Sequence, residues 1–183
     1  PSGEITNLPY LRFAGQQNLP IILSTGMSEM SEIENAINAL VAAGVKRRMI
    51  SLLHCTSEYP TALTDVNLRA MQSMSREFDL EIGYSDHTEG IEVAMAAVAM
   101  GASIIEKHFT LDKNQQGPDH KASLNPEELK RMILGIRNIE KSLGSFEKKP
   151  TRGELENSLF IRKSIVAIRP IRTSTVLETW IHH

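Results

Sequence analysis

The stretch Gly83-Tyr84-Ser85-Asp86-His87 and the later stretch Ser103-Ile104-Ile105-Glu106-Lys107-His108-Phe109 share one organisation: a short apolar run that ends in ionisable residues. The apolar runs are 80–84 and 102–105, and an Ala- and Met-rich segment of helical length, 91–100, separates them. Parallel α/β folds place their chemistry at the carboxyl ends of buried strands. The pattern therefore predicts a strand, a helix and a strand, with His87 and His108 at neighbouring strand ends that face one site.

The same alternation extends on both sides of this stretch. Strands are predicted at 20–24, 49–55, 80–84 and 102–105, and helices around 33–41, 66–78, 91–100 and 126–143. Ser28 is the expected start signal of the first helix, Gly44 its stop, and Pro126 opens the last helix. Four strand–helix units predict a parallel α/β sheet. A doubly wound sheet and a (β/α)8 TIM barrel both fit, and polar residues at every strand end favour the barrel.

The length and the ends of the chain suggest a domain division. A complete barrel takes about 250 residues, so we expect these 183 residues to hold the C-terminal half of one. The sequence begins at Pro1 inside what resembles a strand-end motif, and we treat it as a fragment. The predicted division is a partial barrel at 1–147, a linker at 148–160, and the truncated start of a small β-rich domain at 161–183, with its first strand at 164–168.

Composition excludes several classes of protein. Hydrophobic residues make up 41% and charged residues 23%, as in ordinary globular proteins. The formal net charge of −2 gives no basic surface for nucleic acid or a polybasic membrane patch. Cys55 is the single cysteine, so an internal disulfide is excluded and a reducing, cytoplasmic location is the simplest context. No apolar run approaches the roughly 20 residues of a membrane-spanning helix.

Six motifs occur in order along the chain. They are 1–4 (Pro-Ser-Gly-Glu), 23–27 (Leu-Ser-Thr-Gly-Met), 54–60 (His-Cys-Thr-Ser-Glu-Tyr-Pro), 84–88 (Tyr-Ser-Asp-His-Thr), 106–110 (Glu-Lys-His-Phe-Thr) and 117–123 (Gly-Pro-Asp-His-Lys-Ala-Ser). With these motifs the chain to about Ala167 resembles the sialic acid synthase family, and residues 1–11 resemble its bacterial legionaminic acid branch. The resemblance implies condensation of phosphoenolpyruvate with an N-acylated hexosamine, giving a nine-carbon sugar acid and phosphate. It also implies a homodimer and a C-terminal antifreeze-like (SAF) domain, although 172–175 departs from that domain's usual turn.

His87 and His108 are the candidate metal ligands. Imidazole suits divalent first-row metals, and two protein ligands leave positions open for water and substrate. Their spacing is no metal signature, so two unrelated polar residues are an equal reading from the residues alone. The resemblance assigns them to a catalytic divalent metal, Mn²⁺ first, with Mg²⁺ or Co²⁺ as alternatives. Such a metal would polarise the aldehyde of an open-chain sugar.

Ser2, Ser24 and Ser85 follow three strands and are the candidate anion ligands. Together with Thr25, Thr56 and backbone amides they would cradle a phosphate and a carboxylate. A lone serine after a strand is more often a helix cap. The resemblance implies that all three serines contact phosphoenolpyruvate. It also implies that His54 contacts the same ligand, at a position where some members of the family have Asn. The alternative for His54 is a hydrogen-bonded histidine at a strand end.

The remaining site residues also rest on the resemblance. Glu4, Tyr59 and Asp119 match positions that hold the amino sugar, and Glu4 is counted with the two histidines as catalytic. From the residues alone, Asp119 could equally be a turn-forming residue, and Glu4 could equally be a solvent-exposed acid in a loop. Glu106 and Lys107 are expected to pair with each other and to orient His108. Cys55 is expected to be a small core residue.

Two other classes stay open. A metal-dependent aldolase or related barrel enzyme would take pyruvate through a Schiff base on a buried lysine, and Lys107 is the strand-end candidate, although a charged Glu106 beside it would raise rather than lower its pKa. An inactive fragment that serves at most as a binding module is the non-enzyme reading, because a partial barrel leaves open sheet edges.

Overall fold

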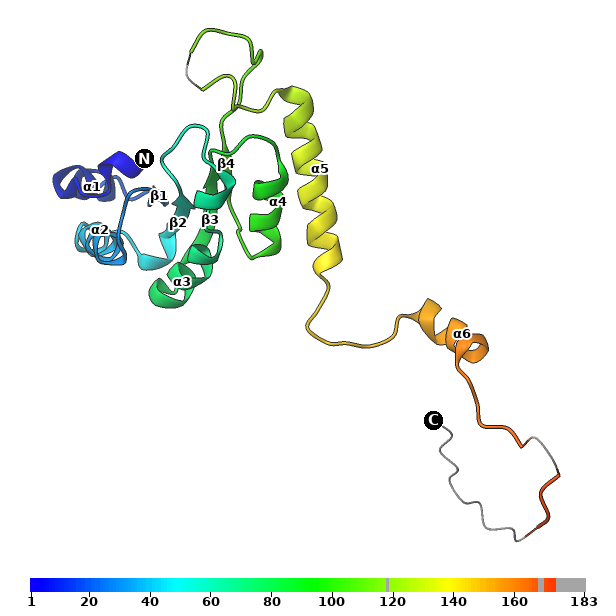
Figure 1. Ribbon diagram of the computed structural model, residues 1–183. Coiled ribbons are helices and arrows are strands. Elements are labelled where there is room, and N and C mark those ends of the chain that lie inside the picture. Colours follow the sequence, from blue (N-terminus) through cyan, green and yellow to red (C-terminus); the bar gives the residue numbers. More distant parts are fainter. Residues whose placement is uncertain (118, 168–169, 174–183) are drawn as a thin grey trace. The chain divides into compact units, whose positions relative to one another are not determined.

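The computed structural model describes residues 1–117, 119–167 and 170–173 (Figure 1). By its internal contacts the chain divides into two units, Pro1–Gly144 and Ser145–His183. The first unit contains a four-stranded sheet and its covering helices. The described residues of the second include the helix α6 (Arg152–Ile161).

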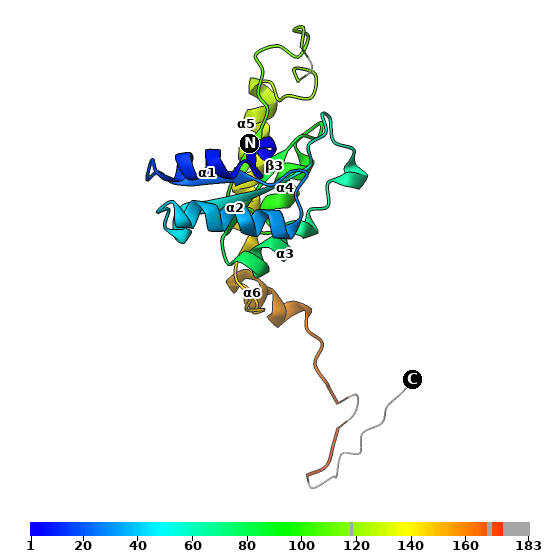
Figure 2. The same ribbon diagram turned by 90° about the vertical axis from the view of Figure 1, so that its left-hand side faces the viewer.

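The sheet is parallel throughout and its strands lie in sequence order. They are β1 (Ile21–Ser24), β2 (Ile50–Cys55), β3 (Glu81–Asp86) and β4 (Ile105–Lys107), paired β1-β2-β3-β4. The helix after each strand is α2 (Met30–Ala42), α3 (Arg69–Phe78), α4 (Glu92–Ala99) and α5 (Pro126–Leu143). Each connection therefore moves over by one strand in one direction, as in a (β/α) barrel, whereas a doubly wound sheet reverses direction. The predicted four units and the α/β class are confirmed as a parallel half-barrel. Figure 2 shows α1 and α2 lying side by side.

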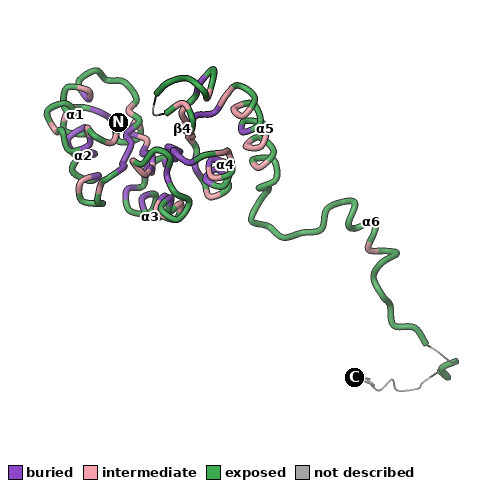
Figure 3. The backbone as a smooth tube through the Cα atoms, turned by 45° about the horizontal axis from the view of Figure 1, so that its top comes forward, coloured by how far each residue is buried: buried purple, intermediate pink, exposed green. Residues whose placement is uncertain are grey.

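The main core lies between the sheet and its helices. Alternate strand residues, such as Leu52 in β2 and Tyr84 in β3, pack against α2 and α3 in one buried cluster. Figure 3 shows this burial along the strands and on the inner sides of the helices. Because successive strand side chains point to opposite faces, the residues between them, including Leu53 and Ser85, point to the other face. That face corresponds to a barrel interior.

Two strands begin and end later than their apolar runs indicate. The predicted strand 80–84 is Glu81–Asp86, and the predicted strand 102–105 is Ile105–Lys107. Pairing between β3 and β4 extends both strands past their apolar runs, since Ser85 pairs with Glu106 and Asp86 with Lys107 in the ladder. Polar residues that were expected just after the strands therefore lie inside them, where the pleat decides their direction.

The amino-terminal segment is helical rather than a strand end. Ser2–Glu4 forms one 3₁₀ turn, and α1 (Leu8–Gly15) follows, which the sequence analysis did not predict. The side chain of Asn7 caps α1 by accepting from the Tyr10 amide, and a proline lies in the first turn. At α2 the cap is Glu29 in a capping box with Glu32, not the expected Ser28.

The second unit holds a helix within the segment expected as a linker. Thr151 and Glu154 form the capping box that begins α6. The strand predicted at 164–168 is not formed by its described residues, 164–167, and Ile168 lies outside the described residues. In the part of the chain that the structure describes, no helix combines the length and the apolar character needed to cross a bilayer.

Candidate functional site

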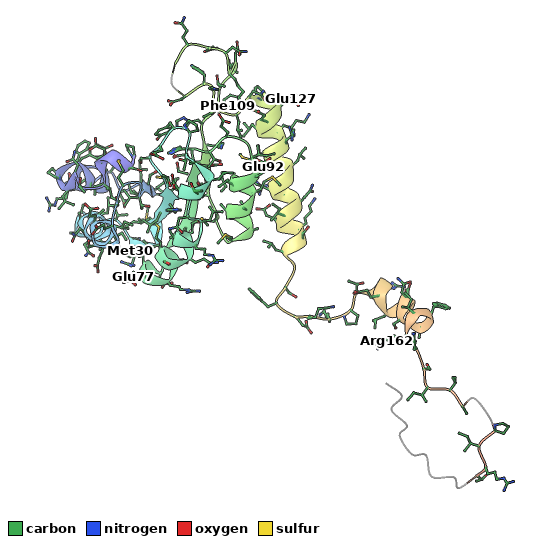
Figure 4. All side chains as sticks on the ribbon, viewed as in Figure 1. Met30, Glu77, Glu92, Phe109, Glu127 and Arg162 are labelled. Carbon is green, nitrogen blue, oxygen red and sulfur yellow. The ribbon has the colours of Figure 1, made fainter. Side chains whose placement is uncertain are left out.

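Polar side chains gather where the parallel strands end, on the face opposite the helices. Phe109, labelled in Figure 4, directly follows His108 and marks this edge of the sheet after β4. Ser24 and Cys55 are the last residues of β1 and β2, and Ser85 is the second-to-last residue of β3. All three are buried. The edge therefore presents small hydroxyl and thiol groups beside two imidazoles.

The structure brings His87 and His108 together, as expected. Their ring centroids are 5.3 Å apart. The ring of Tyr59 lies against both, 4.1 Å from the His87 ring and 5.3 Å from the His108 ring. Because β3 and β4 are neighbours and both histidines follow directly after their strands, the meeting results from the strand pairing.

Hydrogen bonding sets the tautomer of His87. Its Nδ1 lies 2.7 Å from the carbonyl oxygen of Thr56. A carbonyl only accepts, so Nδ1 carries the proton and Nε2 keeps its lone pair. Nε2 lies 3.4 Å from the hydroxyl of Ser85, whose own proton is donated to Glu106 Oε1 at 2.6 Å. The lone pair of Nε2 is therefore directed into the site.

The two imidazoles fit a divalent cation. A metal-binding histidine usually donates its other ring N–H to a carbonyl or carboxylate, as His87 does to Thr56. His108 Nδ1 lies 3.9 Å from Asp119 Oδ2. Among the described residues no set of three His, Cys, Asp or Glu side chains is arranged to hold a metal. Two nitrogen donors would therefore form an open site, completed by water or substrate.

A second small cluster surrounds Gly26. The Gly26 amide donates to Ser2 Oγ at 3.0 Å, and Ser2 Oγ lies 3.1 Å from Cys55 Sγ. A Cβ at Gly26 would come within 2.8 Å of Ser2 Oγ and 2.9 Å of Cys55 Sγ, and nearer still to Ser57 Oγ. The missing side chain therefore leaves a small polar cradle. Ser57 was not among the predicted residues, although it lies in the same motif as His54 and Cys55.

His54 lies on the other face of β2, away from these serines. Its Nε2–H donates to the Val66 carbonyl at 2.9 Å, and its ring centroid is 5.8 Å from that of Tyr84 in the helix-side core. It lines a cavity of about 640 Å³ whose other walls include Arg69 of α3 and residues of α2. The side chains of Leu52 and His54 share the helix side of the pleat, although Thr25 and Cys55 line the same cavity as His54. The expected contact of His54 with phosphoenolpyruvate stays a prediction.

Thr25 and Thr56, named with the serines, are also engaged elsewhere. Thr25 Oγ1 donates to the Leu53 carbonyl at 2.9 Å, and Thr56 Oγ1 donates to the Asp65 carbonyl at 3.1 Å. Both hydroxyls therefore support the local backbone. The Thr56 carbonyl, rather than its hydroxyl, contributes to the site through His87.

The position of His54 predicts a pH effect on stability. Burial lowers the pKa of His54 below 6.5, against the opposing effect of its hydrogen bonds to the backbone at Val66 and Asn67. As pH falls below 6.5 the unfolded chain takes up this proton more readily than the folded chain, so the free energy of unfolding decreases. We expect His54→Asn to flatten this dependence in urea titrations at a series of pH values. His120→Asn, in the loop after β4, is the control; equal slopes in wild type and His54→Asn would contradict the burial argument.

The expected ion pair between Glu106 and Lys107 is absent, and this corrects the sequence analysis. Adjacent strand residues point to opposite faces. Glu106 therefore lies on the site face, where it accepts from Ser85, while Lys107 points to the helices and pairs with Asp86 at 2.9 Å. Glu106 therefore belongs to the site. The sequence analysis paired it with its neighbour Lys107, and only the direction of its side chain in the strand shows the role.

Tyr59, Asp119 and Glu4 lie at different distances from this centre. Burial, followed by the neighbours Cys55, Asp119 and Glu106, raises the pKa of Tyr59, so its phenol remains a neutral donor. Asp119 reaches His108 as described. Glu4 accepts from Asn7 Nδ2 at 2.7 Å and lines a groove beside β1 with Tyr10 and Ile22. The structure thus joins Tyr59 and Asp119 to the histidines and places Glu4 at the free edge of β1.

The fold and the site together define a (β/α)-barrel protein with a polar centre at the carboxyl ends of its strands. Residues 1–148 match the NeuB family, and the chain belongs to that family. It is 55% identical over 178 residues to the N,N'-diacetyllegionaminic acid synthase of Campylobacter jejuni, covering 97% of this chain and 53% of that protein. It is 50% identical over 173 residues to the protein of the same name from Legionella pneumophila, covering 93% and 49%.

Solved structures agree with this placement. The N-acetylneuraminic acid synthetase of Leptospira borgpetersenii, solved with citrate, superposes with a TM-score of 0.77 at 38% identity, over 89% of this chain and 57% of that one. A DAHP synthase from Thermotoga maritima, at 22% identity and a TM-score of 0.66, shares the fold. The chain spans about half the length of the curated relatives that it matches.

Proposed function

We propose that this chain carries part of the active site of a nonulosonic acid synthase of the legionaminic or sialic acid type. In the proposed reaction, C3 of phosphoenolpyruvate bonds to the aldehyde carbon of an N-acylated hexosamine, water adds at C2, and the C2–O bond to phosphate breaks. The observation that carries the proposal is the grouping of His87, His108 and Tyr59 beside the Ser85–Glu106 pair. The synthase relatives support it.

His87 and His108 would hold the divalent cation through ring nitrogens, Mn²⁺ first and Mg²⁺ or Co²⁺ as alternatives. When bound, such a cation supplies Lewis-acid polarisation of the sugar's aldehyde oxygen. The Thr56 carbonyl keeps the proton on His87 Nδ1, so that Nε2 remains a donor of electrons to a metal. The ring of Tyr59 packs against both imidazoles.

Small hydroxyl groups would receive phosphoenolpyruvate. Ser2 accepts from the Gly26 amide, and its hydroxyl would donate to a ligand oxygen in place of Cys55 Sγ, which lies 3.1 Å away. Ser24 and Ser85 lie at the ends of the neighbouring strands on the same face, and Ser57 completes the cradle around Gly26. We therefore assign Ser2, Ser24, Ser57 and Ser85 to the anionic substrate, with the Ser85 hydroxyl turning its proton from Glu106 to the ligand. We leave His54 out of this set.

The amino sugar would be held on the outer side of the histidines. Tyr59, as a neutral phenol, donates to a sugar oxygen, and Asp119 accepts from a sugar hydroxyl or amide. Glu4 completes the proposed set from the edge of β1, with the catalytic role that the family resemblance implies. Schiff-base chemistry has no supporting observation, because Lys107 is buried on the helix side in an ion pair with Asp86.

The organisation of the whole protein is also a proposal. We propose a barrel part at 1–147, a connecting segment at 148–160 and the start of an antifreeze-like domain at 161–183, in a cytoplasmic homodimer. Two findings support the first boundary: the family match ends at residue 148, and the contacts divide the chain after Gly144.

A chimera tests the proposed reaction. These residues would replace the matching 178 residues of the C. jejuni relative, so that its remaining half supplies the rest of the barrel. We expect the chimera to form a nine-carbon sugar acid from phosphoenolpyruvate and an N-acylated hexosamine with Mn²⁺. Oxygen-18 placed in the C2–O–P bridge should leave with phosphate, which mass spectrometry detects.

The unaltered relative is the positive control for the chimera. A folded chimera that consumes pyruvate instead of phosphoenolpyruvate, and that borohydride traps as an amine adduct, would replace the proposal with the aldolase reading. Label retained in the sugar acid would mean P–O cleavage and would overturn the proposed bond changes.

A further inference from the structure

A buried ion pair lies directly behind the two histidines. Lys107 Nζ is 2.9 Å from Asp86 Oδ2, and the two side chains are 3% and 0% exposed. Asp86 Oδ1 accepts from both the amide and the hydroxyl of Thr88, at 2.9 and 2.7 Å. Lys107 also donates to the Thr88 carbonyl. Every polar group of this network is therefore engaged on the helix side of the sheet.

The pair occupies the last rung of the ladder between β3 and β4. Asp86 and Lys107 are register partners, and His87 and His108 are the next residue on each strand. Because the pleat alternates, the ion pair points to the helices and the histidines point to the opposite face. Closing the pair thus draws together the two strand ends that carry the imidazoles.

Two sets of backbone contacts hold this end of β4: its register pairs with β3, and the bridge of Phe109 with Leu124, in which the Leu124 amide donates to the His108 carbonyl at 2.9 Å. The strand is three residues long and forms three register pairs with β3. His108 itself has a distant carboxylate neighbour, Asp119 at 3.9 Å. His87 donates to the Thr56 carbonyl only while its backbone holds the imidazole toward that oxygen. That backbone is held through the next residue, Thr88, which bonds to both Asp86 and Lys107.

The energetics favour a positional role over a stabilising one. Removing two charges from water offsets most of their attraction, so a buried ion pair adds little net stability compared with a neutral pair of similar shape. What the pair does provide is a specific geometry, since Lys107 must meet Asp86 and Thr88 at the same time. The site that benefits from this geometry lies one residue further along each strand.

We propose that Asp86 and Lys107 are positioning residues that set the separation of His87 and His108 and the Nδ1–H tautomer of His87. They act through the strand ends and Thr88, and they touch neither substrate nor metal. The inference rests on the proposed function in taking the histidine pair as the metal site. The tautomer of His87, however, is a property of the chain alone.

The test compares the wild-type chain with Asp86→Asn/Lys107→Met. Asn keeps an acceptor for the Thr88 amide and hydroxyl, and Met keeps the length of the lysine stem without a charge. Imidazole nitrogen shifts, recorded by NMR without metal, report the tautomer of His87. Titration with Mn²⁺, followed by line broadening of the His87 and His108 signals, reports affinity. Thermal unfolding checks the fold.

We expect the double variant to fold, to lose the fixed Nδ1–H tautomer, and to bind Mn²⁺ about 10–100-fold more weakly, the range seen when a partner behind a metal ligand is lost. The single variant Lys107→Arg, which keeps the charge, should retain both properties. A folded double variant with the wild-type tautomer and affinity would overturn the inference. If the double variant fails to fold, Thr88→Val takes its place, with the same readouts and a smaller expected change.

The outcomes also separate this inference from the proposed function. If His87→Ala binds Mn²⁺ as wild type does, the metal site itself is wrong, whereas the tautomer measurement still tests the positioning role. If His87→Ala loses Mn²⁺ and the double variant retains both affinity and tautomer, only the positioning role is wrong.

Discussion

Replacing either His87 or His108 by alanine is expected to abolish Mn²⁺ binding and synthase activity in the chimera with the C. jejuni relative. Two imidazoles supply all the protein nitrogen donors of the proposed site, so the loss of one leaves a single ligand. The loss of affinity should exceed the ~10–100-fold that accompanies loss of a partner behind a ligand. Calorimetric titration with Mn²⁺ and phosphate release measure the two effects.

The chain provides a matched control for this experiment. His54 lies on the opposite face of β2 and bonds the Val66 carbonyl, so His54→Ala should leave Mn²⁺ affinity close to wild type. Both site histidines follow strand ends rather than filling the main core, so the alanine variants should remain folded. Wild-type Mn²⁺ affinity in folded His87→Ala or His108→Ala would remove the ligand assignment.

The second large effect is expected for Lys107→Met alone. This change leaves the Asp86 carboxylate fully buried without its cation. Breaking a buried pair by removing one partner typically destabilises a protein by about 3–5 kcal/mol, whereas neutralising both partners costs far less. Urea unfolding of Lys107→Met and of the double variant Asp86→Asn/Lys107→Met measures the difference.

Lys113→Met is the control for the loss of a lysine. Lys113 pairs with Glu128 at 3.0 Å, but about a third of its side chain is exposed. A pair of this kind contributes about 0–1 kcal/mol. If Lys107→Met and Lys113→Met lower the free energy of unfolding equally, burial does not make loss of Lys107 more destabilising than loss of an exposed lysine.

The sequence alone determined the order of the four strands, the helix after each strand, and the approach of the two histidines. Alternating apolar runs and amphipathic segments specify strands and helices locally, and α5 has the predicted bounds because Pro126 and the acids after it mark its start. His87 and His108 could be predicted to lie near each other because consecutive parallel strands end at one edge, and the register of β3 with β4 then places both on the same face. Serines at those strand ends could be predicted for the same reason.

Tertiary structure decided the face on which each polar residue lies. A one-residue shift in register reverses the face that each side chain of a strand uses, and the ladder between β3 and β4, rather than the apolar runs, aligns Ser85 with Glu106 and Asp86 with Lys107. For this reason Glu106 and Lys107 separate to opposite faces. The pairing of β2 with β1 and β3 places His54 on the helix side in the same way. The Asp86–Lys107 pair and the cradle of Ser2 and Ser57 around Gly26 join residues far apart in the sequence. Only the packing of strands and loops brings such groups within bonding distance.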